Sequence, residues 1–139
     1  MSGLLLEARE ITKTYANGLK EVKVLKGINL VVAAGEMTAV IGASGSGKTT
    51  LLQVLGTLAA PSSGSLYFRG EQLDTRKDRE LASFRNESLG FIFQFHHLLP
   101  EFSALENVMM PALISGRSKN EASPAARKLL AAVELDHRE

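Results

Sequence analysis

The chain has 139 residues, 45% of them hydrophobic and 22% charged, a composition that predicts one globular domain and excludes disordered or low-complexity sequence. Lysine plus arginine (16) nearly balance aspartate plus glutamate (15), so we expect no nucleic-acid partner, since such proteins carry a basic excess. The lack of cysteine excludes disulfides, thiolate zinc sites and cysteine nucleophiles. No signal peptide or apolar run long enough to cross a membrane is recognisable, so we expect any link to a membrane to come through a partner.

The first half of the chain alternates strand patterns with turns and one helix. Apolar and β-branched segments predict strands over residues 4–9, 22–32 (two pieces broken at Gly27), 36–41 and 65–69. The run 36–41 is nearly all apolar, which is typical of a strand buried on both faces. Turns are expected within residues 12–21 and 61–64, and helical spacing predicts a helix over residues 48–58.

The second half is mainly helical. We expect a charged, solvated helix over residues 76–86, a buried strand over 89–93, and a helix over 104–114. A last helix includes residues 127–135, and two starts are possible. Ser118 with Glu121 has capping-box spacing, whereas Ser123-Pro124 reads as a cap followed by proline in the first helical position. Alternating strands and helices argue for an α/β fold.

The sharpest feature lies between the predicted strand 36–41 and the helix that follows it. It fits G-x-x-x-x-G-K-[ST], the phosphate-binding loop, over Gly42-Ala43-Ser44-Gly45-Ser46-Gly47-Lys48-Thr49. Glycines let successive N–H groups point at an anion, and the helix dipole favours the same charge. Lys48 supplies a positive charge, Thr49 a hydroxyl for Mg²⁺, and Thr50 extends the expected phosphate-lining set.

The loop therefore predicts binding of a nucleoside triphosphate with Mg²⁺ as cofactor. The simpler alternative is a flexible Gly/Ser turn that happens to precede a lysine. A dinucleotide loop of the form G-x-G-x-x-G is excluded, because Thr50 stands where its third glycine would be.

With Tyr15 in ITKTYANG and Gln94 in LGFIFQFHHLLPEFSALENV, the chain resembles the ATP-binding subunit of ABC transporters. The resemblance implies a P-loop NTPase-type nucleotide-binding domain of the ABC ATPase class. It implies that Tyr15 stacks on adenine and that Lys48 and Gln94 take part in catalysis. It further implies that Thr49 and Gln94 contact the Mg²⁺ ion. It also implies that Gln94 senses which nucleotide is bound and transmits this to a membrane subunit.

The stretch after Gln94, with Leu135-Asp136-His137-Arg138, resembles the lipoprotein-releasing branch of that family, while macrolide-export and cell-division ATPases stay as alternatives. The implied partners are integral-membrane subunits, meeting the region after Gln94, and a second copy of the ATPase. The implied location is the cytoplasmic face of the bacterial inner membrane. His96 and His97 are expected at that partner surface rather than at a metal, because adjacent residues generally point in different directions.

The resemblance covers the front part of the family's domain. No signature sequence, Walker B acidic motif or switch histidine is found; Asp136 ends an apolar run, but that run holds Glu134 and is helical. We therefore expect residues 1–139 to be the N-terminal part of one ATP-binding domain, truncated before the signature and Walker B motifs. These residues account for ATP binding, and they do not account for hydrolysis by this chain alone. A non-hydrolysing nucleotide-binding module and a small phosphate-loop kinase stay open as other classes.

Overall fold

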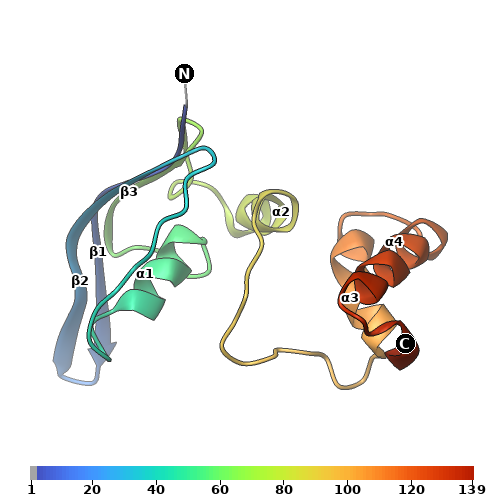
Figure 1. Ribbon diagram of the computed structural model, residues 1–139. Coiled ribbons are helices and arrows are strands. Elements are labelled where there is room, and N and C mark those ends of the chain that lie inside the picture. Colours follow the sequence, from blue (N-terminus) through green and yellow to red (C-terminus); the bar gives the residue numbers. More distant parts are fainter. Residues whose placement is uncertain (1–2) are drawn as a thin grey trace. The chain divides into compact units, whose positions relative to one another are not determined.

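The computed structural model describes residues 3–139 (Figure 1). They divide into two compact units, and the boundary along the sequence lies between Leu81 and Ala82. The first unit holds the antiparallel sheet, the glycine-rich loop and α1. The second unit holds most of α2 together with α3 and α4.

The sheet of the first unit has four antiparallel strands in the order β2-β1-β3-β4. Their bounds are β1 Leu4–Asn17, β2 Lys20–Ala33, β3 Ser63–Phe68 and β4 Glu71–Gln72. The strands expected over 4–9 and 65–69 are confirmed. The turn-rich reading of 12–21 is wrong for most of its length, because the β1–β2 turn needs just two residues, Gly18 and Leu19. Gly18 supplies the positive φ (62°) that such a tight hairpin requires.

β2 is one continuous strand, not the two pieces expected. The pairing slips from Ile11–Ile28 to Thr12–Lys26, so Gly27 is the extra residue of a bulge. Its φ of 85° lies in the left-handed region that glycine adopts without strain. The glycine therefore bends β2 and does not end it.

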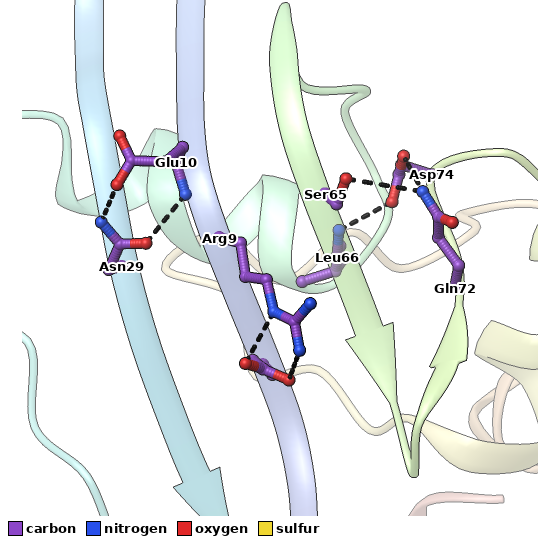
Figure 2. A network of polar contacts seen from close by, with 8 residues as sticks. Arg9, Glu10, Asn29, Ser65, Leu66, Gln72 and Asp74 are labelled. Carbon is purple, nitrogen blue, oxygen red and sulfur yellow. Dashed lines mark hydrogen bonds and ion pairs between the residues drawn. The ribbon is translucent and has the colours of Figure 1, made fainter.

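A second irregularity lies in β1, where the non-glycine residue Glu10 has a φ of 49°. Its backbone N–H donates to Asn29 Oδ1 (3.0 Å), and Asn29 Nδ2 donates back to the Glu10 carboxylate (Figure 2). A Cβ on Gly64 of β3 would lie 2.4 Å from the Glu10 carbonyl oxygen. The close approach of β3 to this bulge thus needs glycine at position 64.

β3 and β4 are joined to the following turn by Asp74. The Leu66 N–H donates to Asp74 Oδ1 (2.7 Å), and Gln72 Nε2 donates to Asp74 Oδ2 (3.0 Å; Figure 2).

An ion pair joins Arg9 and Glu7 on the same sheet. Arg9 Nε lies 2.8 Å from Glu7 Oε1, and the Arg9 guanidinium lies 4.6 Å from the centre of the Tyr67 ring. The Arg9 hydrogen bond lowers the pKa of Glu7, and the same pair raises the pKa of Arg9.

The expected strands over 36–41 and 89–93 are wrong: both segments lie outside helices and strands. Met37 and Ile41 are 97% and 90% exposed, and Ile92 is fully exposed. A strand exists through hydrogen bonds to a neighbour, and no described strand pairs with either segment. An apolar run indicates that a segment favours burial. Without a neighbouring strand to pair with, such a segment does not form a β-strand.

Helix α1 (Lys48–Leu55) confirms the predicted helix and lies along one face of the sheet (Figure 1). Its buried side chains Leu51, Val54 and Leu55 have helical spacing. The other buried apolar residues of this unit come from the sheet and its last turn: Ala8, Ile11, Leu25, Leu66 and Leu73. This core fixes the start of α1, and with it the glycine-rich loop.

The second unit is helical, with α2 (Asp78–Ser88), α3 (Ala104–Ile114), α4 (Lys119–Ala132) and a short 3-10 turn, η1 (Asp136–Arg138). The expected helices over 76–86 and 104–114 are confirmed. Helix α4 begins after Ser118, whose capping box with Glu121 is formed, so Pro124 lies inside the helix and not at its first position. Met109 of α3 packs with Ala122 and Ala126 of α4 as the centre of this unit.

Candidate functional site

The glycine-rich loop runs from Gly42 to Gly47 and leads directly into α1. The Ser46 N–H donates to the Ala43 carbonyl (3.2 Å), which closes a tight turn through Ser44 and Gly45. Gly45 (77°) and Gly47 (97°) both have positive φ. The sequence Gly-x-Gly thus lets the chain reverse and enter a helix within a few residues.

Two glycines are also required by their surroundings. A Cβ on Gly47 would lie 3.0 Å from Val24 Cγ1 and 3.2 Å from the Val24 carbonyl oxygen. A Cβ on Gly42 would lie 2.8 Å from Ser46 Oγ. The loop is therefore pressed against β2 at one end and folded on itself at the other.

The N-terminus of α1 has the properties of an anion site. Gly47 is its N-cap and offers no side chain to accept the first N–H groups, and the first turn holds no acidic residue. Free N–H groups at a helix start, with the dipole behind them, attract phosphate. The contrast within this chain is clear, because α3 and α4 both begin with a serine–glutamate capping box that occupies these donors.

Lys48 brings a positive charge to the same place. Its Nζ donates to the carbonyl oxygens of Gly42 (2.8 Å) and Ala43 (2.7 Å), so the side chain folds back over the loop. No carboxylate forms an ion pair with Lys48 among the described residues. Thr49, next in the helix, is exposed, and Thr50 is half-buried. The predicted loop residues are thus brought together as one cationic cradle.

Tyr15 lies in β1, which pairs with the strand that supports the loop. The hairpin pairs Tyr15 with Val22, two residues before the Val24 that supports Gly47. Tyr15 is 41% exposed, and Lys13 Nζ lies 5.2 Å from the centre of its ring. Lys13 in turn donates to the Ala60 carbonyl (2.6 Å), which ties β1 to the segment after α1. A partly exposed tyrosine is therefore held in β1, paired with the strand that supports Gly47.

Gln94 belongs to the second unit, so the structure does not bring it into one unit with the loop. It is exposed and lies outside helices and strands. Beside it, Phe93 stacks on Phe91 (centres 5.5 Å apart) and meets the ring of His97 edge-on (4.7 Å). His96 is exposed, and residues 3–139 contain no group of three histidine or acidic side chains placed to hold a metal ion.

One residue of this second unit was missed by the sequence analysis. Asn107, in α3, bonds through its side-chain amide to the backbone of Leu99, Phe102 and Ser103. A signal was available, because Asn107 lies four residues after the serine cap and shortly after the turn-forming Leu99-Pro100 pair.

In the same unit, α3 and α4 line a groove of about 330 Å³ that includes Phe102, Met109 and Met110. None of the described helices is long and apolar enough to pass through a bilayer.

Three comparisons place the chain among known proteins. The sequence profile described as ABC transporter matches residues 25–139. A protein of Desulfotalea psychrophila named lipoprotein-releasing system ATP-binding protein LolD is 61% identical over 96% of this chain, and one of the same name from Geobacter metallireducens is 59% identical. The chain spans 60% of the length of each of these relatives.

Solved structures give the same picture. The dimeric structure of MJ0796, described as a bacterial ABC transporter cassette, is 34% identical with a TM-score of 0.87. A second structure of MJ0796, a post-hydrolysis state bound to ADP and Pi, has a TM-score of 0.86. Each match covers 94% of this chain and 57% of the solved one. The fold is that of a nucleotide-binding cassette.

Proposed function

Since the chain belongs to the ABC transporter family, we propose that it is part of an ATP-binding subunit that drives release of lipoproteins from the bacterial inner membrane. The proposed nucleotide binding rests on a single observation. The start of α1 has no side-chain cap, and Lys48 folds back over the loop there. The lipoprotein part is supported by relatives of that name at 61% and 59% identity, and it is preferred to the macrolide-export and cell-division alternatives.

The phosphates of ATP would lie in the loop from Gly42 to Gly47. There the N–H groups at the start of α1 donate to no capping side chain, and the helix dipole favours an anion at this end. Lys48 would exchange its two carbonyl acceptors, on Gly42 and Ala43, for phosphate oxygens. That exchange removes no buried ion pair, because Lys48 has none among the described residues.

Mg²⁺ suits the donors in this cradle. The Thr49 hydroxyl is exposed at the first turn of α1, and a magnesium ion commonly takes one or two protein ligands and completes its shell with phosphate and water oxygens. When bound, the ion neutralises charge on the phosphate oxygens. Gln94 is proposed as the residue that senses the γ-phosphate and metal, on the family resemblance.

Tyr15 is proposed as the platform for adenine. Its ring is partly exposed, and the hairpin register keeps it beside the strand that supports Gly47. Stacking on an aromatic face is favourable for any base, so the ring supplies affinity rather than base selectivity.

The partners proposed are a second copy of the subunit and integral-membrane subunits that meet the region after Gln94. MJ0796 is described as dimeric, and the relatives belong to a lipoprotein-releasing system. The exposed apolar side chains Phe95 (72%) and Leu98 (68%) suit a protein contact. The subunit would then work at the cytoplasmic face of the inner membrane as a peripheral protein.

The test is ATP-dependent release of lipoprotein from vesicles that contain the full-length protein with its membrane subunits. Lys48→Ala should reduce release to the level seen without ATP, whereas Lys20→Ala, a lysine at the β1–β2 hairpin, should leave it within about twofold. Equal release by Lys48→Ala and the parent would contradict the nucleotide role. ATP hydrolysis without release of lipoprotein would contradict the substrate class.

A further inference from the structure

The loop that contains Gln94 has a part without hydrogen bonds, where Phe93 contacts the rings of Phe91 and His97, and a part whose backbone is hydrogen-bonded. Residues 90–98, all of which the structure describes, form no hydrogen bond, and Ile92 and Phe95 are largely exposed. From Leu99 onward the backbone is bonded. The Phe102 N–H donates to the Leu99 carbonyl (3.2 Å), closing a four-residue turn with Pro100 at its second position.

One side chain fixes that turn. Asn107 Oδ1 accepts from the Leu99 N–H (2.9 Å), and Asn107 Nδ2 donates to the Leu99 carbonyl (3.1 Å). The same Nδ2 donates to the carbonyls of Phe102 (3.1 Å) and Ser103 (2.9 Å). Leu99 thus has both of its backbone groups held by a single amide, much as a neighbouring strand would hold them.

The chemistry of this contact is specific to asparagine. It needs one acceptor facing an N–H and a donor facing three carbonyl oxygens within a short reach. Aspartate would place charge against those carbonyls, and alanine would remove all four of these side-chain hydrogen bonds. Asn107 is half-buried in α3, whose N-terminus is independently closed by the Ser103–Glu106 capping box.

We propose that Asn107 is a positioning residue that makes Leu99 the fixed end of the Gln94 loop and so carries nucleotide-dependent movement of Gln94 into α3. This rests on the proposed function, because the movement is the response of Gln94 to bound nucleotide. A loop with slack at both ends would absorb a displacement at Gln94. A loop whose backbone is bonded to Asn107 at Leu99 passes the displacement to α3, the helix that contains Asn107.

The first measurement is amide hydrogen exchange in the ligand-free, full-length protein. In Asn107→Ala the exchange of the Leu99 and Phe102 amides should rise about tenfold or more, while α4 keeps its protection. The matched control is Asn86→Ala, since Asn86 Nδ2 donates to one carbonyl of the same unit, that of Pro111 (3.0 Å). Unchanged exchange at Leu99 in Asn107→Ala would overturn the anchor. Asn107→Leu, which keeps the approximate size of the side chain and removes its hydrogen bonds, serves if the alanine variant does not fold.

The second measurement adds ATP and Mg²⁺ and follows exchange across α3. The parent and Asn86→Ala should show an ATP-dependent change there, and Asn107→Ala should lose it while binding a fluorescent ATP analogue within about twofold of the parent. Retention of the change in Asn107→Ala, or its absence from a parent that binds the analogue, would overturn the transmission role. A parent that binds no analogue would instead contradict the proposed function, and the ligand-free comparison would still decide the anchor.

Discussion

At the residue scale, Lys48 and Gly47 contribute different things to the phosphate site. Lys48 contributes charge, and its Nζ is held by two neutral carbonyl oxygens that a phosphate can replace. Gly47 contributes shape, because any larger residue would meet Val24 at 3.0 Å and would have to adopt a φ near 97°. The motif therefore needs both residue types for separate physical reasons.

Tyr15 gives a prediction at the same scale. Tyr15→Ala should weaken binding of ATP by about 1–3 kcal/mol, roughly 5- to 150-fold, because it removes the stacking surface. Tyr15→Phe keeps an aromatic face and should stay within about threefold of the parent. Titration with ATP·Mg²⁺ by calorimetry measures both. Equal affinity in the alanine variant would mean that the base does not stack on this ring.

At the element scale, α4 is fixed at its start by a capping box. The Ser118 N–H donates to Glu121 Oε2 (2.8 Å), and the Ser118 hydroxyl both donates to that carboxylate and accepts from the Glu121 N–H. The backbone hydrogen bond, then the hydroxyl, then the charge of Arg117 lower the pKa of Glu121 below its ordinary value. The ionised carboxylate is therefore part of the cap.

The cap predicts a pH dependence with a definite sign. A carboxyl whose pKa is lower in the folded state adds stability above its unfolded pKa, and that stability is lost as pH falls through the folded value. Protection of α4 amides from exchange should thus decline as the solution is acidified below the usual glutamate range. Glu121→Gln should flatten this decline, and Glu134→Gln, whose side chain forms no described hydrogen bond, should not. An equal decline in both variants would remove Glu121 from the cap.

The elements also show what the sequence could predict. Helix α3 was predicted at its observed bounds, because apolar spacing is a local signal. The start of α4 was ambiguous because proline at position 124 fits a first turn as well as an interior position, and the formed Ser118 cap resolves it. The strands expected at 36–41 and 89–93 are wrong, because a strand needs a neighbouring strand and hydrophobicity alone does not show whether one is present.

At the scale of the whole molecule, the predicted site is divided between the two units. The loop, Lys48, Thr49 and Tyr15 lie in the first unit, where the core around α1 fixes their geometry, and Gln94 lies in the second. The motif spacing was sufficient to predict the phosphate-binding loop, since its residues are consecutive in the sequence. Asn107 was not predicted, because its four bonds depend on how the turn at Leu99 folds back on α3.

The measurement that tests the central claim most directly is calorimetric titration of the full-length protein with ATP·Mg²⁺. The account predicts saturable binding at one site per chain. It predicts affinity at least about tenfold lower in Lys48→Ala, which removes a charge-assisted contact, and unchanged within about twofold in Lys20→Ala. Equal affinity in Lys48→Ala and the parent, or no binding by the parent, would contradict the assignment of the glycine-rich loop as the nucleotide site.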